Sequence, residues 1–278
     1  MKKNNIKQEV ITDFGKNWET YKQNRYIEKF NKPQFERYFK NFPWKKIKKH
    51  SKGFDAGCGT GRWAYFVAPK VGRLYCVDPS SAINVAKKNL NKFKNCFFYK
   101  KTLDEMPIKN NSMDFGYSLG VLHHIEDTEK ALLDCVKKLK PKAPFLLYLY
   151  YLHDNKPKWY HFLWLIADTI FRKNISKLSF KKKYFFSNLI ALFVYWPLSR
   201  FSLIMEKFGI KVDNFPLSFY RDKPFYVLKT DSLDKVGTKI EKRFTKKQIN
   251  KMMKKCGLNK IIFNKNAPYW CAIGFKKN

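Results

Sequence analysis

In Phe54-Asp55-Ala56-Gly57-Cys58-Gly59-Thr60-Gly61, an apolar strand end is followed by a glycine-rich turn and then by a helix. Glycine has no Cβ, so the backbone can turn sharply at these positions and approach a ligand closely. Roughly 20 residues further on, the apolar run Tyr75-Cys76-Val77 ends at Asp78, whose carboxylate can accept both hydroxyls of a ribose. The two features together predict a nucleoside across two strand ends. A dinucleotide is disfavoured, because Arg62 stands where the G-x-G-x-x-G fingerprint requires its third glycine.

The surrounding sequence predicts an α/β fold. From Ser51 to Tyr151, short apolar runs alternate with helix-length amphipathic stretches, which is typical of βαβ units around a parallel sheet. Strands are expected over residues 53–56, 73–77, 96–99, 113–118, 145–150, 260–263 and 269–275, and helices over 62–68, 81–90, 128–138 and 245–256. The prediction is a Rossmann-like seven-stranded, mostly parallel sheet with helices on both faces, closed by an antiparallel hairpin strand.

Four segments follow from this pattern. An N-terminal helical cap is expected over 1–50, with two short helices over 17–49 punctuated by Pro33 and Pro43. The cofactor-binding core spans 51–154. Residues 155–239 are rich in aromatics and leucines at helical spacing, which predicts a helical insert after the fifth strand that serves as a substrate lid. Residues 240–278 complete the sheet.

The order and spacing of these motifs resemble class I S-adenosylmethionine-dependent methyltransferases of the broad subfamily that acts on small molecules. The resemblance covers 14–151 and 245–275 and implies that loop 55–61 holds the methionine part, Asp78 the ribose, and the turn 102–107 the adenine. The family has an acid where Thr102 stands, so Asp104 is an alternative adenine contact. An N-terminal helix covers the cofactor in many relatives. The cofactor-binding residues implied are Trp18, Tyr21, Asp55, Gly57, Cys58, Gly59, Gly61, Asp78, Pro79, Thr102, Leu103, Asp104 and Leu119.

His123 and His124 are the candidate catalytic residues. They follow the fourth strand, and ligands in such sheets lie outside the carboxyl ends of the strands. Either imidazole can take a proton near neutral pH, although packing alone would also account for both. The alternative is a purely positional site built from Tyr150, Tyr151 and the insert. Within the insert, polar and aromatic groups concentrate at the substrate candidates Tyr220, Arg221, Asp222, Tyr226 and Asp231.

The expected function is transfer of a methyl group from S-adenosylmethionine to an O, S, C or N atom of a small acceptor, such as a sugar, cell-envelope or lipid-linked metabolite. Ser118-Leu119-Gly120-Val121 stands where methyltransferases of base amino groups carry an Asn/Asp-Pro-Pro-Tyr-like element, which argues against that reaction. The alternatives are RNA methylation and a non-catalytic, cofactor-binding regulatory protein. The six cysteines include no Cys-x-x-Cys pair, so no metal site is indicated.

The net charge of +35 bears on partners, because a basic surface attracts anions. Only eight of the 57 basic residues are arginines, the residue preferred for base readout, so nucleic acid is a disfavoured partner. The N-terminus has no secretory pattern, and we expect a cytoplasmic protein. Residues 184–199 lack charge but fall short of the roughly 20 apolar residues of a span. Burial against the core or a partner subunit is favoured; a helix on the inner membrane face, beside Lys181 to Lys183, is the alternative.

Overall fold

The computed structural model describes residues 6–23 and 27–278. The chain divides into two compact units. The first, here the core unit, comprises Met1–Tyr151 and Lys242–Asn278, and the second, here the insert unit, comprises Leu152–Glu241. The insert predicted over 155–239 lies within the second unit. Each unit is described by itself.

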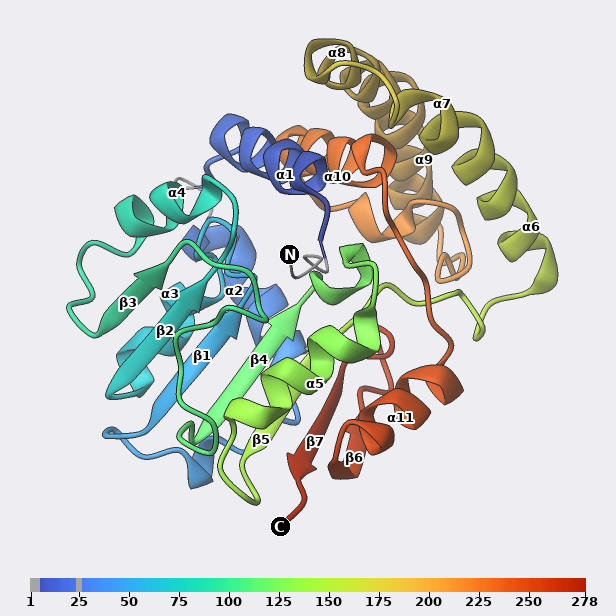
Figure 1. Ribbon diagram of the computed structural model, residues 1–278. Coiled ribbons are helices and arrows are strands. Elements are labelled where there is room, and N and C mark those ends of the chain that lie inside the picture. Colours follow the sequence, from blue (N-terminus) through green and yellow to red (C-terminus); the bar gives the residue numbers. More distant parts are fainter. Residues whose placement is uncertain (1–5, 24–26) are drawn as a thin grey trace. The chain divides into compact units, whose positions relative to one another are not determined.

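The core unit is built on a seven-stranded sheet with the order β3-β2-β1-β4-β5-β7-β6 (Figure 1). Strands β1 to β5 pair in parallel, whereas β7 is antiparallel to both β5 and β6. The predicted fold class is therefore confirmed. The strands are β1 (Lys52–Ala56), β2 (Arg73–Val77), β3 (Cys96–Tyr99), β4 (Phe115–Leu119), β5 (Pro144–Tyr148), β6 (Leu258–Phe263) and β7 (Ala272–Lys276).

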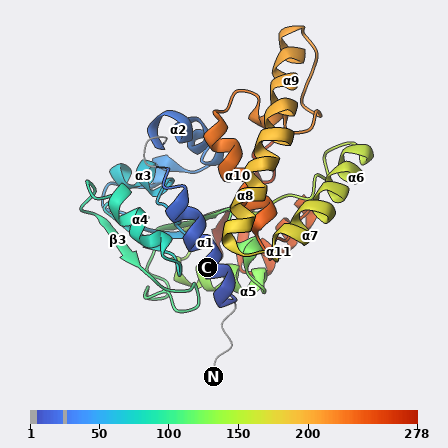
Figure 2. The same cartoon turned by 90° about the horizontal axis from the view of Figure 1, so that it is seen from above.

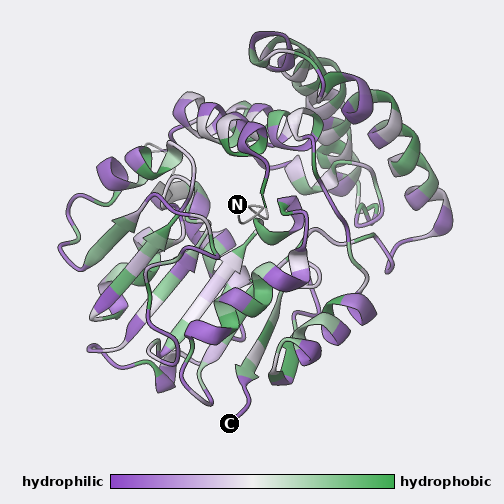
Figure 3. Ribbon diagram, viewed as in Figure 1, coloured by the Kyte–Doolittle hydropathy of each residue, from purple (hydrophilic) through white to green (hydrophobic). Residues whose placement is uncertain are grey.

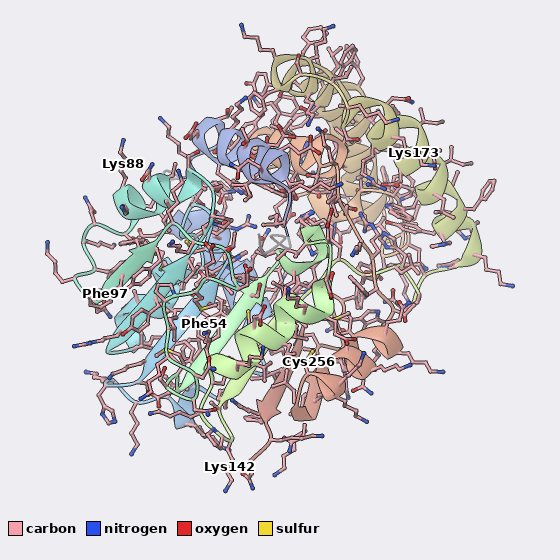
Figure 4. The ribbon with its side chains drawn as sticks, viewed as in Figure 1. Phe54, Lys88, Phe97, Lys142, Lys173 and Cys256 are labelled. Atoms are coloured by element: carbon pink, nitrogen blue, oxygen red, sulfur yellow. The ribbon has the colours of Figure 1, made fainter. Side chains whose placement is uncertain are left out.

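Helices cover both faces of this sheet. One face packs against α5 (Thr128–Lys138) and α11 (Lys246–Lys255). The other packs against α2 (Ile27–Tyr38), α3 (Ala64–Val67) and α4 (Ala82–Asn89), and α1 (Gln8–Thr20) packs against α4. Short 3-10 turns follow at η2 (Trp44–Lys46), η3 (Ala68–Lys70) and η4 (Leu122–His124). In Figure 4, Phe54 lies within the sheet, whereas Lys88 and Lys142 extend outward.

Local signals account for the helix ends. The side chain of Asp127 accepts a hydrogen bond from the backbone N–H of Lys130 and so caps α5. At α11, Thr245 and Gln248 form a reciprocal capping box.

The N-terminal prediction was wrong in detail. Helix α1 begins at Gln8, upstream of the predicted start at residue 17, and Pro33 lies inside α2 instead of separating two helices. A proline in a helix interior removes one backbone hydrogen bond. Here Phe35 and Phe39, which follow it, are buried in the core unit, and this burial outweighs the lost bond.

The centre of the sheet depends on two glycines that face phenylalanine rings. A Cβ on Gly53 would lie 2.0 Å from Cζ of Phe115, and a Cβ on Gly116 would lie 2.4 Å from the ring of Phe54. The two strands pair in parallel, Gly53 opposite Phe115 and Phe54 opposite Gly116. Each ring therefore covers the glycine of the neighbouring strand. Both rings are fully buried, so neither can move aside.

We expect Gly53→Ala to lower the free energy of unfolding by about 2 to 3 kcal/mol, because the added methyl overpacks an interior that has no room for it. Lys52→Ala is the matched control, since its side chain is exposed one residue earlier on the same strand, and its effect should stay within about 0.5 kcal/mol. Urea denaturation followed by circular dichroism measures both. Equal stability of the two variants would contradict the packing described.

The insert unit is helical. Its core comprises Ile175, Ile190, Tyr195, Tyr220, Leu228 and Val236. Helices α8 and α9, joined through the π-helical segment η6, form one continuous helix over Phe180–Lys207 (Figure 2). The elements are α6 (Lys158–Ala167), the π-helical segment η5 (Asp168–Arg172), α7 (Lys173–Ile175), α8 (Phe180–Ile190), η6 (Ala191–Tyr195), α9 (Trp196–Lys207), the 3-10 turn η7 (Ser218–Tyr220) and α10 (Phe225–Gly237).

Candidate active site

The glycine loop connects β1 to the helical turn that follows it. Gly57, Gly59 and Gly61 all have positive φ, at 81°, 52° and 78°. The backbone N–H groups of Gly57 and Cys58 donate to the carbonyl of Val77, at 2.8 and 3.1 Å, which ties the loop to the end of β2. A Cβ on Gly57 would lie 2.4 Å from Val121, so the loop also approaches the segment after β4 closely. The loop is thus held at the carboxyl ends of three strands.

Asp78 anchors this loop from the end of β2. Its Oδ2 accepts the N–H of Gly59 at 2.9 Å. Its Oδ1 accepts the N–H and the hydroxyl of Ser80, at 2.9 and 2.6 Å. Burial raises the pKa of this carboxyl, and these hydrogen bonds oppose the rise. A carboxylate oxygen can accept more than one hydrogen bond, so Oδ2 keeps capacity for a hydroxyl of a bound nucleoside. Pro79, which follows Asp78, is partly exposed.

Asp55 is the buried acid of the loop. Burial raises the pKa of its carboxyl to about 8, so much of it is protonated at neutral pH. Its Oδ2 makes no hydrogen bond among residues 6–23 and 27–278, although the nearby hydroxyl of Tyr117 partly opposes the rise in pKa. A buried carboxyl oxygen without a partner is costly. Asp55 is therefore suited to receive a cationic group of a ligand.

The turn after β3 separates the two candidates for the adenine contact. Thr102 and Leu103 are buried, whereas Asp104 is exposed. The hydroxyl oxygen of Thr102 also has no hydrogen-bond partner in the part of the chain that the structure describes. The geometry therefore favours Thr102 over Asp104 as a polar contact of a buried ligand.

Helix α1 packs over the glycine loop. A Cβ on Gly59 would lie 3.7 Å from Nε1 of Trp18, and a Cβ on Gly15 would lie 2.5 Å from the hydroxyl of Ser81. The guanidinium of Arg62 lies between two indoles, 5.4 Å from the ring of Trp18 and 4.7 Å from that of Trp63. Tyr21 is buried at the end of α1. The helix is thus placed to shield the loop from water.

His123 and His124 lie together in the turn after β4, where Leu119 is the last, buried residue of the strand. Their ring centroids are 4.0 Å apart, and His123 stacks on Tyr150 at 4.0 Å. Burial, with His124 and Arg243 close by, holds the pKa of His123 well below its usual range. Neither nitrogen of His123 has a hydrogen-bond partner among the described residues. This imidazole is therefore neutral at pH 7.

His124 and Tyr151 complete this side of the site. His124 packs against Phe14 of α1, with ring centroids 4.7 Å apart. Tyr151 forms a β-bridge to Phe244 and packs against Tyr269 at 5.4 Å. The structure therefore brings Tyr150 against His123, while Tyr151 packs against the segment that returns from the insert.

The substrate candidates of the insert unit contact one another or their neighbours within that unit. The hydroxyl of Tyr220 donates to Asp231 at 2.9 Å and accepts from Lys235 at 2.8 Å. Arg221 forms a bidentate pair with Glu206, with both bonds at 2.7 Å. Asp222 pairs with Lys223, and the carbonyl of Tyr226 accepts the hydroxyl of Thr230. These contacts stabilise the insert, and Arg221 in particular has a structural partner.

All six cysteines are free and buried. Burial raises the pKa of Cys58, inside the loop, to about 11. This thiol is therefore uncharged at neutral pH and not a nucleophile.

Two residues of the site were not predicted. Ser80 binds Asp78, and the signal was present in the sequence, because an Asp two residues before a Ser is typical of a local turn in which the carboxylate binds backbone N–H groups. Arg62 contacts the indole of Trp18, and nothing in the sequence pattern pairs these two positions.

The residues present fit an adenosine ligand that carries an amino acid. The glycine loop allows close backbone approach, and a carboxylate stands at the second strand end. Asp55 and Thr102, two of the buried groups with an unpartnered oxygen, could satisfy an ammonium and an amino group. This fit rests on positions in the core unit alone.

Comparisons with known proteins agree with this arrangement. Residues 54–147 match the sequence profile of a methyltransferase domain. The structure is similar to a putative methyltransferase from Haloferax volcanii, solved in complex with the Trm112 methyltransferase activator. That similarity has a TM-score of 0.57 at 11% identity and covers 95% of this chain and 98% of that one. No curated protein sequence matches the chain.

Two further structures are similar over only part of their own length. A phosphoethanolamine N-methyltransferase 2 from Haemonchus contortus, bound to phosphomonomethylethanolamine and S-adenosylhomocysteine, has a TM-score of 0.50 at 17% identity, over 90% of this chain and 45% of that one. A putative sarcosine dimethylglycine methyltransferase from Galdieria sulphuraria has a TM-score of 0.39 at 23% identity, over 41% and 46%. The chain thus spans less than half of either protein. At these identities the likeness concerns the fold.

Proposed function

Since residues 54–147 form a class I methyltransferase domain, we propose that this chain transfers a methyl group from S-adenosylmethionine to a small organic acceptor. The observation that carries the proposal is the set of buried groups at the carboxyl ends of β1 to β4. Asp55, Asp78 and Thr102 line up there with the glycine loop, in the order in which methionine, ribose and adenine require them. The Ser118–Val121 sequence supports a small acceptor over a nucleic-acid base.

Each part of the cofactor is assigned to residues of the core unit. The loop 55–61 and Asp55 hold the methionine part, Asp78 holds the ribose, and Thr102 with Leu103 holds the adenine. When bound, the cofactor supplies an electrophilic methyl group on a sulfonium. Trp18 and Tyr21 on α1, with Leu119, keep water away, because exclusion of water and alignment are most of what this reaction needs from a protein.

The two imidazoles are assigned different roles. His123, neutral and stacked on Tyr150, is a weak proton acceptor because its pKa lies well below neutral. We assign it to positioning and assign the acceptor proton, where the acceptor is a hydroxyl, to His124. An amine or thiolate acceptor needs no such base. Tyr151 and the insert residues Asp222, Tyr226 and Asp231 are assigned to acceptor choice. Tyr220, buried in the core of the insert unit, and Arg221, paired with Glu206, stabilise that unit.

The raised pKa of Asp55 predicts a pH dependence of cofactor binding. The ionised carboxylate pairs with the ammonium of the methionine part, whereas the free protein with a pKa of about 8 holds this carboxyl mostly protonated below that pH. Affinity for S-adenosylhomocysteine should therefore rise with pH between 6 and 7.5, by up to about tenfold per pH unit. Calorimetric titration across this range measures it. In Asp55→Asn the dependence should vanish; an equally flat profile in the unchanged protein would remove Asp55 from the ammonium site.

The proposed function is tested by incubating the protein with a cell extract and S-adenosylmethionine that carries an isotopically labelled methyl group. The extract is separated into small-molecule, lipid, RNA and protein fractions, and each is measured by mass spectrometry. Label in a small molecule or a lipid, absent with Asp78→Ala, is the expected result. Label in RNA alone would support the RNA methyltransferase alternative. Label in no fraction, with cofactor binding intact, would support a non-catalytic binding protein.

A further inference from the structure

The long helix of the insert unit is apolar on its exposed side. Five exposed side chains follow one side of this helix, at spacings of seven, eight, three and four residues. They are Phe186, Phe193, Phe201, Ile204 and Phe208. Phe193 is 70% exposed and Phe208 80% exposed. This helix is also long and apolar enough to cross a membrane by length and composition, and 28% of its most apolar window is buried. The exposed side of this stretch is therefore not buried against the described chain, and its burial against a partner subunit, the other form of that expectation, is one outcome of the test below.

The buried side of the same helix mixes polar and apolar residues. Ile190, Ala191 and Tyr195 are buried, and so are Lys183, Ser187, Ser199 and Ser202. The hydroxyls of Ser187, Ser199 and Ser202 donate to carbonyls three residues earlier in the helix, at 3.0, 2.9 and 2.8 Å. The hydroxyl of Ser232 on α10 donates to the carbonyl of Ser187 at 2.9 Å. The exposed side carries four phenylalanines, so large aromatic side chains of this helix lie where a water-soluble helix normally carries polar residues.

A second apolar stripe, here the α6 stripe, runs along α6 and into η5. Its five side chains are all exposed and follow one another at spacings of three, one, three and four residues. They are Trp159, Phe162, Leu163, Ile166 and Ile170. Phe162 is 63% exposed, and no residue of α6 is buried. Much of the ribbon from α6 to α9 is green in Figure 3. Two separate helices of the unit thus each expose a row of large apolar side chains.

The charges around these stripes are almost all positive. Between Lys158 and Lys211 the sequence has ten Lys or Arg residues and two acids. Both acids are neutralised within the unit, Asp168 by Arg172 and Glu206 by Arg221. The lysines at the ends of the helices are exposed, namely Lys158, Lys173, Lys177, Lys181, Lys182, Lys207 and Lys211. Figure 4 shows Lys173 at the surface of the unit.

We propose that the insert unit docks on an anionic lipid bilayer, with the α8–α9 stripe and the α6 stripe in the headgroup and upper acyl region and the flanking lysines on the phosphates. Aromatic residues with lysines at the edges are the composition of interfacial helices. An interface with a second copy of the chain is less well matched, because lysine is depleted in protein interfaces. Each basic residue near such a surface strengthens binding, and the exposed lysines here are complementary to anionic headgroups.

The helix lies on the bilayer and does not cross it. Its buried side packs against α10, which carries Lys229, Asp231, Asp234 and Lys235. The guanidinium of Arg200, in the middle of α9, donates to the backbone carbonyls of Arg221 and Lys223. Immersing these groups on all sides in hydrocarbon would be costly, whereas at the interface they face the protein and water.

The test is flotation of the full chain with vesicles of phosphatidylcholine alone or with phosphatidylglycerol added. The chain should float with the anionic vesicles, and the double variant Phe193→Ser, Phe201→Ser should bind roughly a hundredfold more weakly, about tenfold per aromatic side chain. Lys181→Glu with Lys182→Glu should weaken binding to the anionic vesicles by roughly tenfold or more. Phe97→Ser with Ile262→Ser is the matched control, since these exposed side chains (37% and 49%) lie on the sheet of the core unit, and it should bind as the unchanged chain does.

Quenching of tryptophan fluorescence by brominated lipid is a second measurement that needs no variant, because Trp159 lies on the α6 stripe and Trp196 is exposed on α9. Quenching on anionic vesicles is the expected result. No flotation and no quenching would overturn the proposal. So would equal binding by the aromatic double variant and the control. A dimer in light scattering that the aromatic variant converts to a monomer, with no vesicle binding, would assign the stripes to a second copy instead.

Discussion

Replacing Asp78 by alanine is expected to weaken S-adenosylhomocysteine binding by about 2 to 4 kcal/mol, roughly 30- to 1,000-fold. Two effects add. The ribose hydroxyls lose a charged acceptor, which alone is worth about 1.5 to 3 kcal/mol. The N–H of Gly59 also loses its acceptor at 2.9 Å, so the loop that surrounds the methionine part is no longer fixed to the end of β2. Isothermal titration calorimetry gives the affinity, and circular dichroism verifies the fold.

Asp104→Ala is the matched control for this variant. It removes the same charge from the neighbouring strand end, but its side chain is exposed. We expect its effect on affinity to stay within about 0.5 kcal/mol. Unchanged affinity in Asp78→Ala would exclude Asp78 from the site. A large loss of affinity in Asp104→Ala would mean that Asp104, and not Thr102, contacts the adenine.

A valine at Gly59 is expected to weaken cofactor binding by about 3 kcal/mol or more while the chain stays folded. Gly59 has φ of +52°, a region that β-branched residues hardly adopt, so the loop must change its backbone. The branched side chain would also enter the space between the loop and Trp18, because a Cβ at this position lies only 3.7 Å from the indole nitrogen. The strain falls on a loop and not on the sheet, and thermal unfolding should therefore remain cooperative.

Gly59→Ala separates the two causes. Its single methyl fits at 3.7 Å from Trp18, so only the backbone strain of about 1 to 2 kcal/mol remains. We expect a loss of affinity of roughly five- to thirtyfold, well short of that in the valine variant. Titration of both variants with S-adenosylhomocysteine provides the comparison. Undiminished binding by Gly59→Val would mean that this loop does not hold the cofactor.

The parts of the fold that the sequence predicted well are those in which local pattern and tertiary packing agree. The strand over 73–77 and the helix over 128–138 have the expected bounds, because apolar runs end at turn residues and Asp127 caps the helix. At Pro33 the local pattern predicts a helix break, because proline lacks the backbone donor. Long-range burial of Phe35 and Phe39 outweighs that local cost, and a single sequence contains no measure of such burial.

The site was predictable where a residue's role follows from its place at a strand end, as for Asp55 and Asp78. The site was less predictable where burial determines which of two residues close in sequence can contact a ligand. Thr102 and Asp104 are two residues apart, and only the fold shows that the threonine is buried and the acid exposed. The exposure of one apolar side of the α8–α9 helix could not be predicted from periodicity, because periodicity locates an apolar side without saying whether protein, lipid or a partner covers it.

The central claim is that the carboxyl ends of β1 to β4 bind S-adenosylmethionine. Isothermal titration calorimetry of the unchanged chain with S-adenosylhomocysteine, at about pH 7.5, where the Asp55 carboxyl is partly ionised, tests it most directly. We expect saturable binding of one ligand per chain, which Asp78→Ala weakens at least thirtyfold and Asp104→Ala leaves intact. Absence of binding by a folded chain, or binding that neither Asp78→Ala nor Gly59→Val alters, would contradict it.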